Sequence, residues 1–421
     1  MAAMWQCQGV KATAAPAGAV RQGSLRELNL ALVLGRIAAA PRPPSRAALA
    51  AETGLTRATV SAVVEDLVAG RLVTEAEPTP RAGAGRPARG LVLAGDGPAG
   101  LGLEINVDYL AACVVDLSGE VRHHVVHRAD LRPVSAADAL GRLARLAAGA
   151  RAAADEQGLT LAGAALGVPG LVDAAGQVRL APNLGWRDVP VPELLASHPP
   201  LAEAVDGVPA LVVENEANLA ALAELHAGAG PDNFLHVSGE VGIGAGIVLD
   251  GALYRGSRGW SGEIGHIPVR PDGPPCRCGG RGCLERYAGQ EAILSAAGLA
   301  GADLPADTAP TRLAQLAEAG EAAALDALHE AGTALGVTVA SVVNLLDLDT
   351  VVLGGGYAPL TPWLRPPMLA EIDRRVLTAA WSPVTVRPAT LGATAAAVGA
   401  AGSVVRRIIA RPAGWLARVG S

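Results

Sequence analysis

Apolar residues near the N-terminus recur at helical spacing in three short blocks that turn signals separate. The first block predicts an amphipathic helix over residues 24–37, which ends at a cluster of three prolines. Ser45 and Thr56 are suitable N-cap residues for two further helices, and Gly54 suits a turn with positive φ between them. Two short helices joined by such a turn predict a helix-turn-helix unit. The expected core-facing residues are Leu25, Leu28, Leu32, Leu34 and Ile37 in the first helix and Val60, Val63, Val64, Leu67 and Val68 in the last.

The segment after these helices predicts a wing. Residues 72–73 and 91–93 are short apolar runs typical of strands, and the turn at 78–87 between them is rich in Gly, Pro and Arg. The last helix begins with short or basic outward residues that can enter a major groove, and an arginine in the wing can read a narrow minor groove. A helical interaction domain with a flexible linker is the alternative. The expected DNA-binding residues are Arg57, Thr59, Ser61 and Arg86.

The rest of the chain alternates β-rich runs with helical ones. Residues 102–115 predict a hairpin that turns at Val107 and Asp108, and residues 136–156 predict an amphipathic helix. This alternation favours an α/β body with helices on both faces of a sheet. Further short buried strands are expected at 162–167, 211–214, 235–237 and 351–353.

Net charge changes sign along the chain. The whole chain carries −6, but the first 90 residues hold eleven basic and six acidic residues and so carry +5, against −11 for the remainder. This asymmetry fits a DNA-binding head on an acidic body, although a solvated basic surface would give the same count. The first 20 residues lack periodicity and are expected to form a disordered tail. Because no uncharged apolar run reaches 18 residues, we expect a soluble cytoplasmic protein without a membrane segment.

Three of the five cysteines fall within eight residues, which argues against a secreted disulfide framework. Cys276, Cys278 and Cys283 lie on a Gly-rich and Arg-rich stretch that is a poor candidate for a buried core of free thiols. His266 precedes them by ten residues and supplies the imidazole for a closed tetrahedral Cys3His site. Since such a site leaves no open ligand position, we expect one structural zinc ion per chain.

Several short motifs after residue 100 form a recognisable set. They are residues 167–170 (GVPG), 182–186 (PNLGW), 214–218 (ENEAN), 242–246 (GIGAG), 262–266 (GEIGH), the cysteine cluster and 354–356 (GGG). On these motifs the chain resembles the ROK family of repressors, open reading frames and sugar kinases, and its head fits the repressor branch. The resemblance implies an actin-like fold, similar to sugar kinases and ribonuclease H, with two lobes around a cleft. The implied domains are a tail at 1–20, a winged helix-turn-helix at 21–95, a first lobe at 96–210, a second lobe with the zinc site at 211–390 and a C-terminal helix at 391–421 that returns to the first lobe.

Sugar recognition needs several fixed polar groups that face the hydroxyls, because a site built to pair with each hydroxyl rejects analogues that lack one. The resemblance implies that a set of such groups lines the cleft. His266 would then hold zinc through one ring nitrogen and offer the other to a hydroxyl. Asn183 is a weaker candidate on a loop near the cleft. The expected sugar-binding residues are Asn215, Glu216, Glu263, His266 and Glu285.

One expected kinase feature is missing. The resembling kinases carry an Asp-x-Gly-Gly-Thr turn that approaches ATP phosphates, whereas residues 104–108 of this chain read Glu-Ile-Asn-Val-Asp. The bulky Ile105 and Val107 should block that approach. Glu216 stands where the kinases carry an aspartate base, and a glutamate can still accept a proton. The body is therefore interpreted as a sensor.

Three functional hypotheses follow. The first is a repressor, without kinase activity, that binds operator DNA as a homodimer or dimer of dimers and responds to a sugar or sugar-phosphate effector. The second is a ROK-type sugar kinase with an N-terminal extension. The third is a DNA-binding protein whose body is a dimerisation scaffold and binds no sugar. The lost phosphate turn and the added head favour the first.

Overall fold

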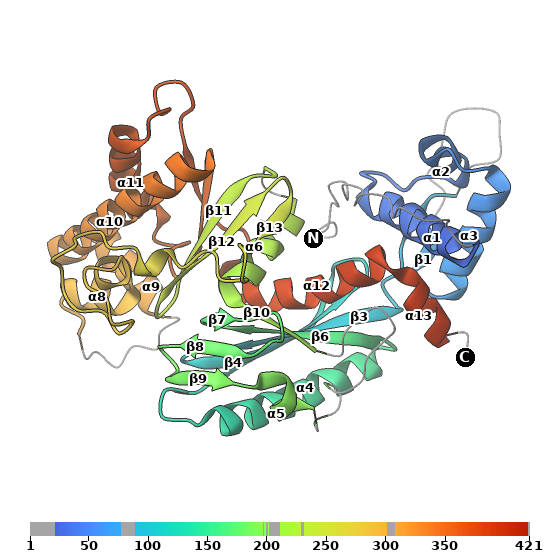
Figure 1. Cartoon of the computed structure of the whole chain (residues 1–421), viewed down its shortest axis with the longest axis horizontal. Coiled ribbons are helices and arrows are strands. Elements are labelled where there is room, and N and C mark those ends of the chain that lie inside the picture. Colours follow the sequence, from blue (N-terminus) through green and yellow to red (C-terminus); the bar gives the residue numbers. More distant parts are fainter. Residues whose placement is uncertain are drawn as a thin grey trace.

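The computed structural model describes residues 22–76, 89–196, 198, 201, 211–228, 231–300 and 308–419. Figure 1 shows a two-lobed α/β body and a small N-terminal head, joined by the helices at the C-terminal end of the chain. This arrangement confirms the predicted fold class, an actin-like body with an N-terminal winged helix-turn-helix domain. In the described part of the chain, every helix is too short or too polar to cross a bilayer.

The head has the elements that its sequence predicts. Ser45 caps its second helix by accepting from the Ala48 N–H at 3.2 Å, and Thr56 caps the third by accepting from the Thr59 N–H at 3.1 Å. Gly54 between them adopts a φ of 72°, as the turn requires. The elements are α1 (Gln22–Ala39), α2 (Arg46–Thr53), α3 (Arg57–Ala69) and the antiparallel pair β1 (Val73–Glu75) and β2 (Leu91–Leu93).

The predicted core face of α1 is partly wrong. Leu34 and Ile37 are buried, but three leucines of the predicted face, Leu25, Leu28 and Leu32, are 48%, 56% and 38% exposed. The true core face combines the two buried residues with Leu30 and Val33, which pack against α12 and α13 as well as against the head. In α3 the prediction holds for Val60, Val63, Val64 and Leu67 but fails for Val68, which is 40% exposed.

The first lobe is built on a five-stranded sheet in the order β10-β6-β3-β4-β5. β3 and β4 form the predicted hairpin, and the helix α4 (Ala136–Glu156) has the predicted bounds. Because β10 pairs in parallel with β6, the first sheet ends at Asn215, five residues beyond the lobe boundary expected at residue 210. The strands are β3 (Pro98–Ile105), β4 (Tyr109–Asp116), β5 (Val121–Arg128), β6 (Thr160–Val168) and β10 (Leu211–Asn215).

A small antiparallel sheet extends the first lobe toward the second. It comprises β7 (Leu171–Val172), β8 (Val178–Ala181) and β9 (Trp186–Val189), and the short helix α5 (Val191–Leu195) follows it. The loop between β8 and β9 carries Asn183.

The second lobe has its own five-stranded sheet, in the order β13-β12-β11-β14-β15. One face packs against α10 and α11, and the other packs against α6 (Glu216–His226), which lies between the lobes. The strands are β11 (Phe234–Gly239), β12 (Ile243–Leu249), β13 (Ala252–Tyr254), β14 (Thr350–Gly355) and β15 (Thr385–Pro388). The helices are η1 (Ile264–His266), α7 (Glu285–Ala288), α8 (Gln290–Ala296), α9 (Ala309–Glu318), α10 (Ala322–Leu346), α11 (Thr361–Arg375) and η2 (Gly392–Thr394).

The C-terminal helices return to the first lobe and reach the head. α12 (Ala395–Ala410) covers the face of the first sheet opposite α4, and α13 (Pro412–Val419) continues to α1 (Figure 1). The backbone of α12 lies very close to the backbones of β3 and α6, one on each side of the helix. A Cβ at Gly102 in β3 would clash with the Ala397 carbonyl, and a Cβ at Gly399 would clash with the Leu219 carbonyl in α6. α12 is therefore packed tightly against the first sheet and against α6.

Candidate ligand cleft and metal centre

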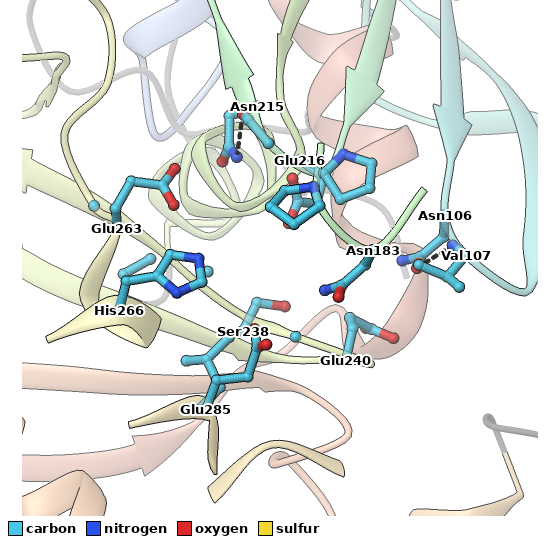
Figure 2. Close-up of a pocket in the computed structure, with 18 residues that line it drawn as sticks. Asn106, Val107, Asn183, Asn215, Glu216, Ser238, Glu240, Glu263, His266 and Glu285 are labelled. Atoms are coloured by element: carbon cyan, nitrogen blue, oxygen red, sulfur yellow. Dashed lines mark hydrogen bonds between the residues drawn. The ribbon is translucent and has the colours of Figure 1, made fainter. Parts of the chain in front are cut away.

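A polar cleft of about 660 Å³, counting the part open to solvent, lies where the two lobes meet. Its walls come from the β3–β4 turn and the β10–α6 junction of the first lobe and from the β11–β12 turn, η1 and α7 of the second. The structure brings all five predicted sugar-binding residues to this cleft: Asn215, Glu216, Glu263, His266 and Glu285 (Figure 2).

Two glycines allow the carboxylates to converge. A Cβ at Gly242 would lie 2.8 Å from Glu285 Oε2 and 2.8 Å from the Asn183 amide nitrogen. A Cβ at Gly244 would lie 3.2 Å from Glu216 Oε1. The other carboxylate oxygen of Glu216, Oε2, is buried and makes no hydrogen bond within the described structure. A buried oxygen without a partner is costly, and this atom can still accept a hydrogen bond.

Asn215 has a structural role that the sequence pattern did not reveal. Its side-chain oxygen caps α6 by accepting from the N–H groups of Ala217 at 2.9 Å and Asn218 at 3.2 Å. Its amide nitrogen donates to the Gly170 carbonyl at 3.2 Å. One amide N–H is left beyond these bonds. Asn215 therefore fixes the start of α6, on which Glu216 is the first residue.

Burial shifts the acid–base behaviour of the cleft. Burial and, to a smaller extent, the nearby carboxyls of Glu263 and Glu104 raise the pKa of Glu216 to about 8. Burial and, to a smaller extent, the carboxyl of Glu285 raise the pKa of Glu263 to about 7. Carboxyls with a pKa near neutrality exist in both forms, so they can accept hydrogen bonds or donate them. Polyol hydroxyls are matched to such groups because they too donate and accept.

The β3–β4 turn is closed on itself. Asn106 Oδ1 accepts from the Val107 N–H at 2.7 Å, and the Asn106 N–H donates to the Tyr109 carbonyl at 2.9 Å. Val107 faces the cleft, as expected, but Ile105 lies in the core beneath it. Glu104 is also buried and accepts from the Tyr109 hydroxyl at 2.5 Å. The turn thus has internal partners for the N–H groups that a phosphate loop would direct outward.

A candidate metal centre borders the cleft. His266 Nδ1 lies 3.8 Å from Cys276 Sγ, Cys278 Sγ lies 3.7 Å from Cys283 Sγ, and all four ligand atoms lie within 4.8 Å of one another. A tetrahedron with a metal–sulfur distance of about 2.3 Å has edges of about 3.8 Å, so this donor set fits a four-coordinate metal ion. His266 belongs to both the cluster and the cleft. The geometry therefore links the metal centre with the ligand site.

The predicted DNA-contacting residues differ in accessibility. Arg57 is exposed on the first turn of α3, and Ser61, one turn later, is half-buried. Thr59 is also half-buried, and its hydroxyl is bonded to that of Thr56 at 2.8 Å, so it contributes to the helix cap. Arg86 lies outside the described residues.

The sequence reasoning missed three residues: two line the cleft, and one joins the body to the head. Ser238 and Glu240 lie in the cleft, at the end of β11 and just after it. Trp415 Nε1 in α13 donates to the Gly70 carbonyl at 2.8 Å. Glu240 stands within the glycine-rich segment around residues 239–246, where a large acidic residue was a signal that could have been used.

Comparisons with known proteins assign the family. A model of the ROK family matches residues 100–407. The chain belongs to the ROK family. A model of the MarR family matches residues 31–84, which include the helix-turn-helix of this ROK protein.

Its relatives include regulators and kinases. The xylose repressor of Bacillus subtilis is 29% identical over 391 residues, which cover 91% of this chain and 96% of the repressor. A solved ROK family transcriptional regulator, described as a homologue of the E. coli MLC protein, has a TM-score of 0.75 at 25% identity and covers 94% of this chain and 98% of its own. A ROK family glucokinase from Streptomyces griseus, solved with glucose and AMPPNP, has a TM-score of 0.61 at 29% identity and covers 72% of this chain and 98% of the kinase.

Proposed function

We propose that this ROK protein is a sugar-responsive transcriptional repressor of carbohydrate-metabolism genes and has no sugar kinase activity. One observation carries the proposal. A helix-turn-helix head shares a chain with a polar cleft whose β3–β4 turn is closed by Asn106 and Val107. The xylose repressor of Bacillus subtilis and the solved ROK regulator match both the head and the body of this chain. The glucokinase from Streptomyces griseus leaves more than a quarter of this chain unmatched.

In this proposal the cleft binds the sugar and α3 binds the operator. Glu216, Glu263 and Glu285 exchange hydrogen bonds with sugar hydroxyls, and the remaining amide N–H of Asn215 contributes one more. Arg57 and Ser61 face the major groove, Thr59 supports the helix start, and Arg86 in the wing enters the minor groove. Because a helix of 13 residues contacts few base pairs, the operator is read by a homodimer or a dimer of dimers.

The cluster of His266 and the three cysteines is proposed to hold one structural zinc ion. Three thiolates and one imidazole complete a tetrahedron and leave no position for a substrate. His266 would coordinate through Nδ1, the atom nearest Cys276, and offer Nε2 to the ligand. The ion would thereby fix a sugar-binding side chain and the start of α7, where Glu285 lies.

A continuous set of packed elements is proposed to couple the two sites. Glu216 begins α6, and α6 packs against α12 at Gly399. α12 leads into α13, whose Trp415 is bonded to the carbonyl of Gly70 at the end of α3. A sugar that favours one placement of α6 can thus bias the placement of α3, with coupling of about 1 to 3 kcal/mol being typical of such systems.

Trp415→Phe is expected to weaken this coupling. The substitution keeps an aromatic ring but removes the N–H that bonds Gly70, which leaves a buried carbonyl without its partner at a cost of about 1 to 3 kcal/mol. The ratio of operator dissociation constants with and without sugar should fall several-fold. Trp381→Phe is the control, because Trp381 is 82% exposed. An unchanged ratio in the Trp415 variant would refute this route.

The function is tested by measuring DNA binding and catalysis on the same preparation. DNA sites are selected from a random duplex pool, and fluorescence anisotropy then follows the release of the selected site by D-xylose, D-glucose and N-acetylglucosamine. We expect one of these to change operator affinity, and we expect ATP turnover with each to remain far below about 1 per second. Turnover at that rate would favour the kinase. A body that responds to no sugar would favour the scaffold hypothesis.

A further inference from the structure

The cleft has two chemically different ends. Glu263 and His266 lie at one end, beside the metal centre, and Asn106, Val107 and Glu240 lie toward the other (Figure 2). The second end is bounded by the β3–β4 turn and by the turn after β11. A phosphate group on a bound sugar would need donors or cations at one of these ends.

Three backbone donors at the second end already have partners. The Glu240 N–H donates to the Gly242 carbonyl at 3.0 Å, and the Gly356 N–H donates to the Gly239 carbonyl at 2.7 Å. The Val107 N–H donates to Asn106, as described above. These three N–H groups are therefore not free to bind phosphate oxygens as the N–H groups of nests and phosphate loops do.

The carboxyl of Glu240 occupies the space between those turns. A Cβ at Gly355 would lie only 2.5 Å from Glu240 Oε1, so the carboxyl rests against the turn that ends β14. Burial raises the pKa of Glu240 well above its usual range, and the carboxyls of Glu104, Asp108 and Glu216 raise it further. The surroundings of Glu240 therefore disfavour a negative charge on its carboxyl, and they disfavour the charge of a phosphate group for the same reason.

The ionisable lining offers no compensating cation. Among the described residues that line the cleft, the ionisable side chains are Glu216, Glu240, Glu263, Glu285 and His266, with no lysine or arginine. Arg277 contacts the rim, where it donates to Asn183 Oδ1 at 3.5 Å, but its charge is paired with Glu291 at 3.1 Å. A phosphate carries about −1.5 to −2 charges at pH 7, so its entry would leave that charge without a partner.

We propose that the effector of this cleft is a sugar without a phosphate group, and that Glu240 is the residue that rejects phosphorylated sugars. The inference rests on the proposed function and narrows its ligand class. Specificity here arises from an unfavourable feature built against the competitor as well as from the hydroxyl-binding groups.

The direct test compares matched ligand pairs on the full-length protein by titration calorimetry. The pairs are D-xylose with D-xylose 5-phosphate, D-glucose with D-glucose 6-phosphate, and N-acetylglucosamine with its 6-phosphate. For any pair whose free sugar binds, we expect the phosphorylated sugar to bind about a hundred-fold more weakly than the free sugar or not at all. Equal or tighter binding of the phosphate overturns this inference and leaves the proposed function intact. Binding of neither member of any pair overturns both.

Variants then assign the rejection to Glu240. Glu240→Ala removes the carboxyl and opens the space beside Gly355, so the affinity ratio of sugar to sugar phosphate should narrow on the order of ten-fold. Glu193→Ala, at an exposed glutamate on α5, should leave the ratio unchanged. The assignment fails if a Glu240→Ala protein with a cooperative melting transition retains the parent ratio. The affinity ratio of sugar to sugar phosphate in the parent protein tests the inference even if one of the variants does not fold.

Discussion

Cys278→Ser is expected to remove the bound metal and to loosen the segment between η1 and α7. The variant keeps three of the four metal ligands. The serine hydroxyl is a much weaker ligand for zinc than the cysteine thiolate that it replaces. Metal binding to structural zinc sites in small peptides contributes about 10 to 16 kcal/mol to their folding. In this protein most of the core around the second sheet comes from its strands and from α10 and α11, and this segment adds Ile264, Leu284 and Ala288 to it. The loss should therefore fall mainly on the segment that carries His266 and Glu285.

Metal analysis of purified protein measures this result. The parent should contain about one zinc per chain, and Cys278→Ser should contain well under half of that. Cys113→Ala is the control, because Cys113 is buried in β4 outside the cluster and should retain the metal. A parent without stoichiometric zinc would contradict the assignment, and so would a Cys278→Ser protein that keeps it. Sugar affinity should fall together with the metal, since His266 belongs to both sites.

Glu224→Ala is expected to lower the free energy of unfolding by about 3 to 5 kcal/mol, because it leaves the partly buried Arg387 and two backbone N–H groups without their partner. Glu224 in α6 is fully buried and accepts from the Thr390 N–H at 2.5 Å and the Leu391 N–H at 3.1 Å. It also forms an ion pair with Arg387 at 3.4 Å. These bonds fasten α6 to the segment that connects β15 with α12.

Urea denaturation compares this variant with Glu318→Ala, at an exposed glutamate on α9. The control should differ from the parent by less than about 0.5 kcal/mol, as is usual at surface positions. Glu224→Gln should lie between the two, since an amide oxygen can still accept from the backbone. A loss of less than about 1 kcal/mol in Glu224→Ala would show that the hydrogen bonds and the ion pair of Glu224 do not fasten α6 to the segment between β15 and α12.

Local signals were sufficient to predict several elements. α4 has the predicted bounds because its apolar period is long and Ser135 caps it, with the side chain accepting from the Asp138 N–H at 3.1 Å. The turns and caps of the head were predictable for the same reason. The cysteine spacing likewise predicted a cluster, because ligands that are close together on one loop can converge without contacts to distant parts of the fold.

Features that depend on distant contacts were not predictable. The buried face of α1 depends partly on α12 and α13, whose residues lie more than 350 positions away, so the leucine spacing alone predicted that face only in part. β10 joined the first lobe because it pairs with β6, which its own residues do not indicate. Glu240 was missed because a glycine-rich segment predicts a turn but not which side chain projects from it. The cap role of Asn215 depends on the register between β10 and α6.

The central claim is that a sugar in the cleft controls the head, and operator affinity of Glu216→Ala with and without sugar tests it most directly. Removing Glu216 deprives a sugar hydroxyl of its partner, so sugar affinity should fall about ten-fold or more. Without sugar, the variant should bind operator as the parent does, because the substitution lies outside the head. At the sugar concentration that switches the parent, its operator affinity should stay unchanged. A Glu216→Ala protein that responds at the same concentration as the parent would contradict the account.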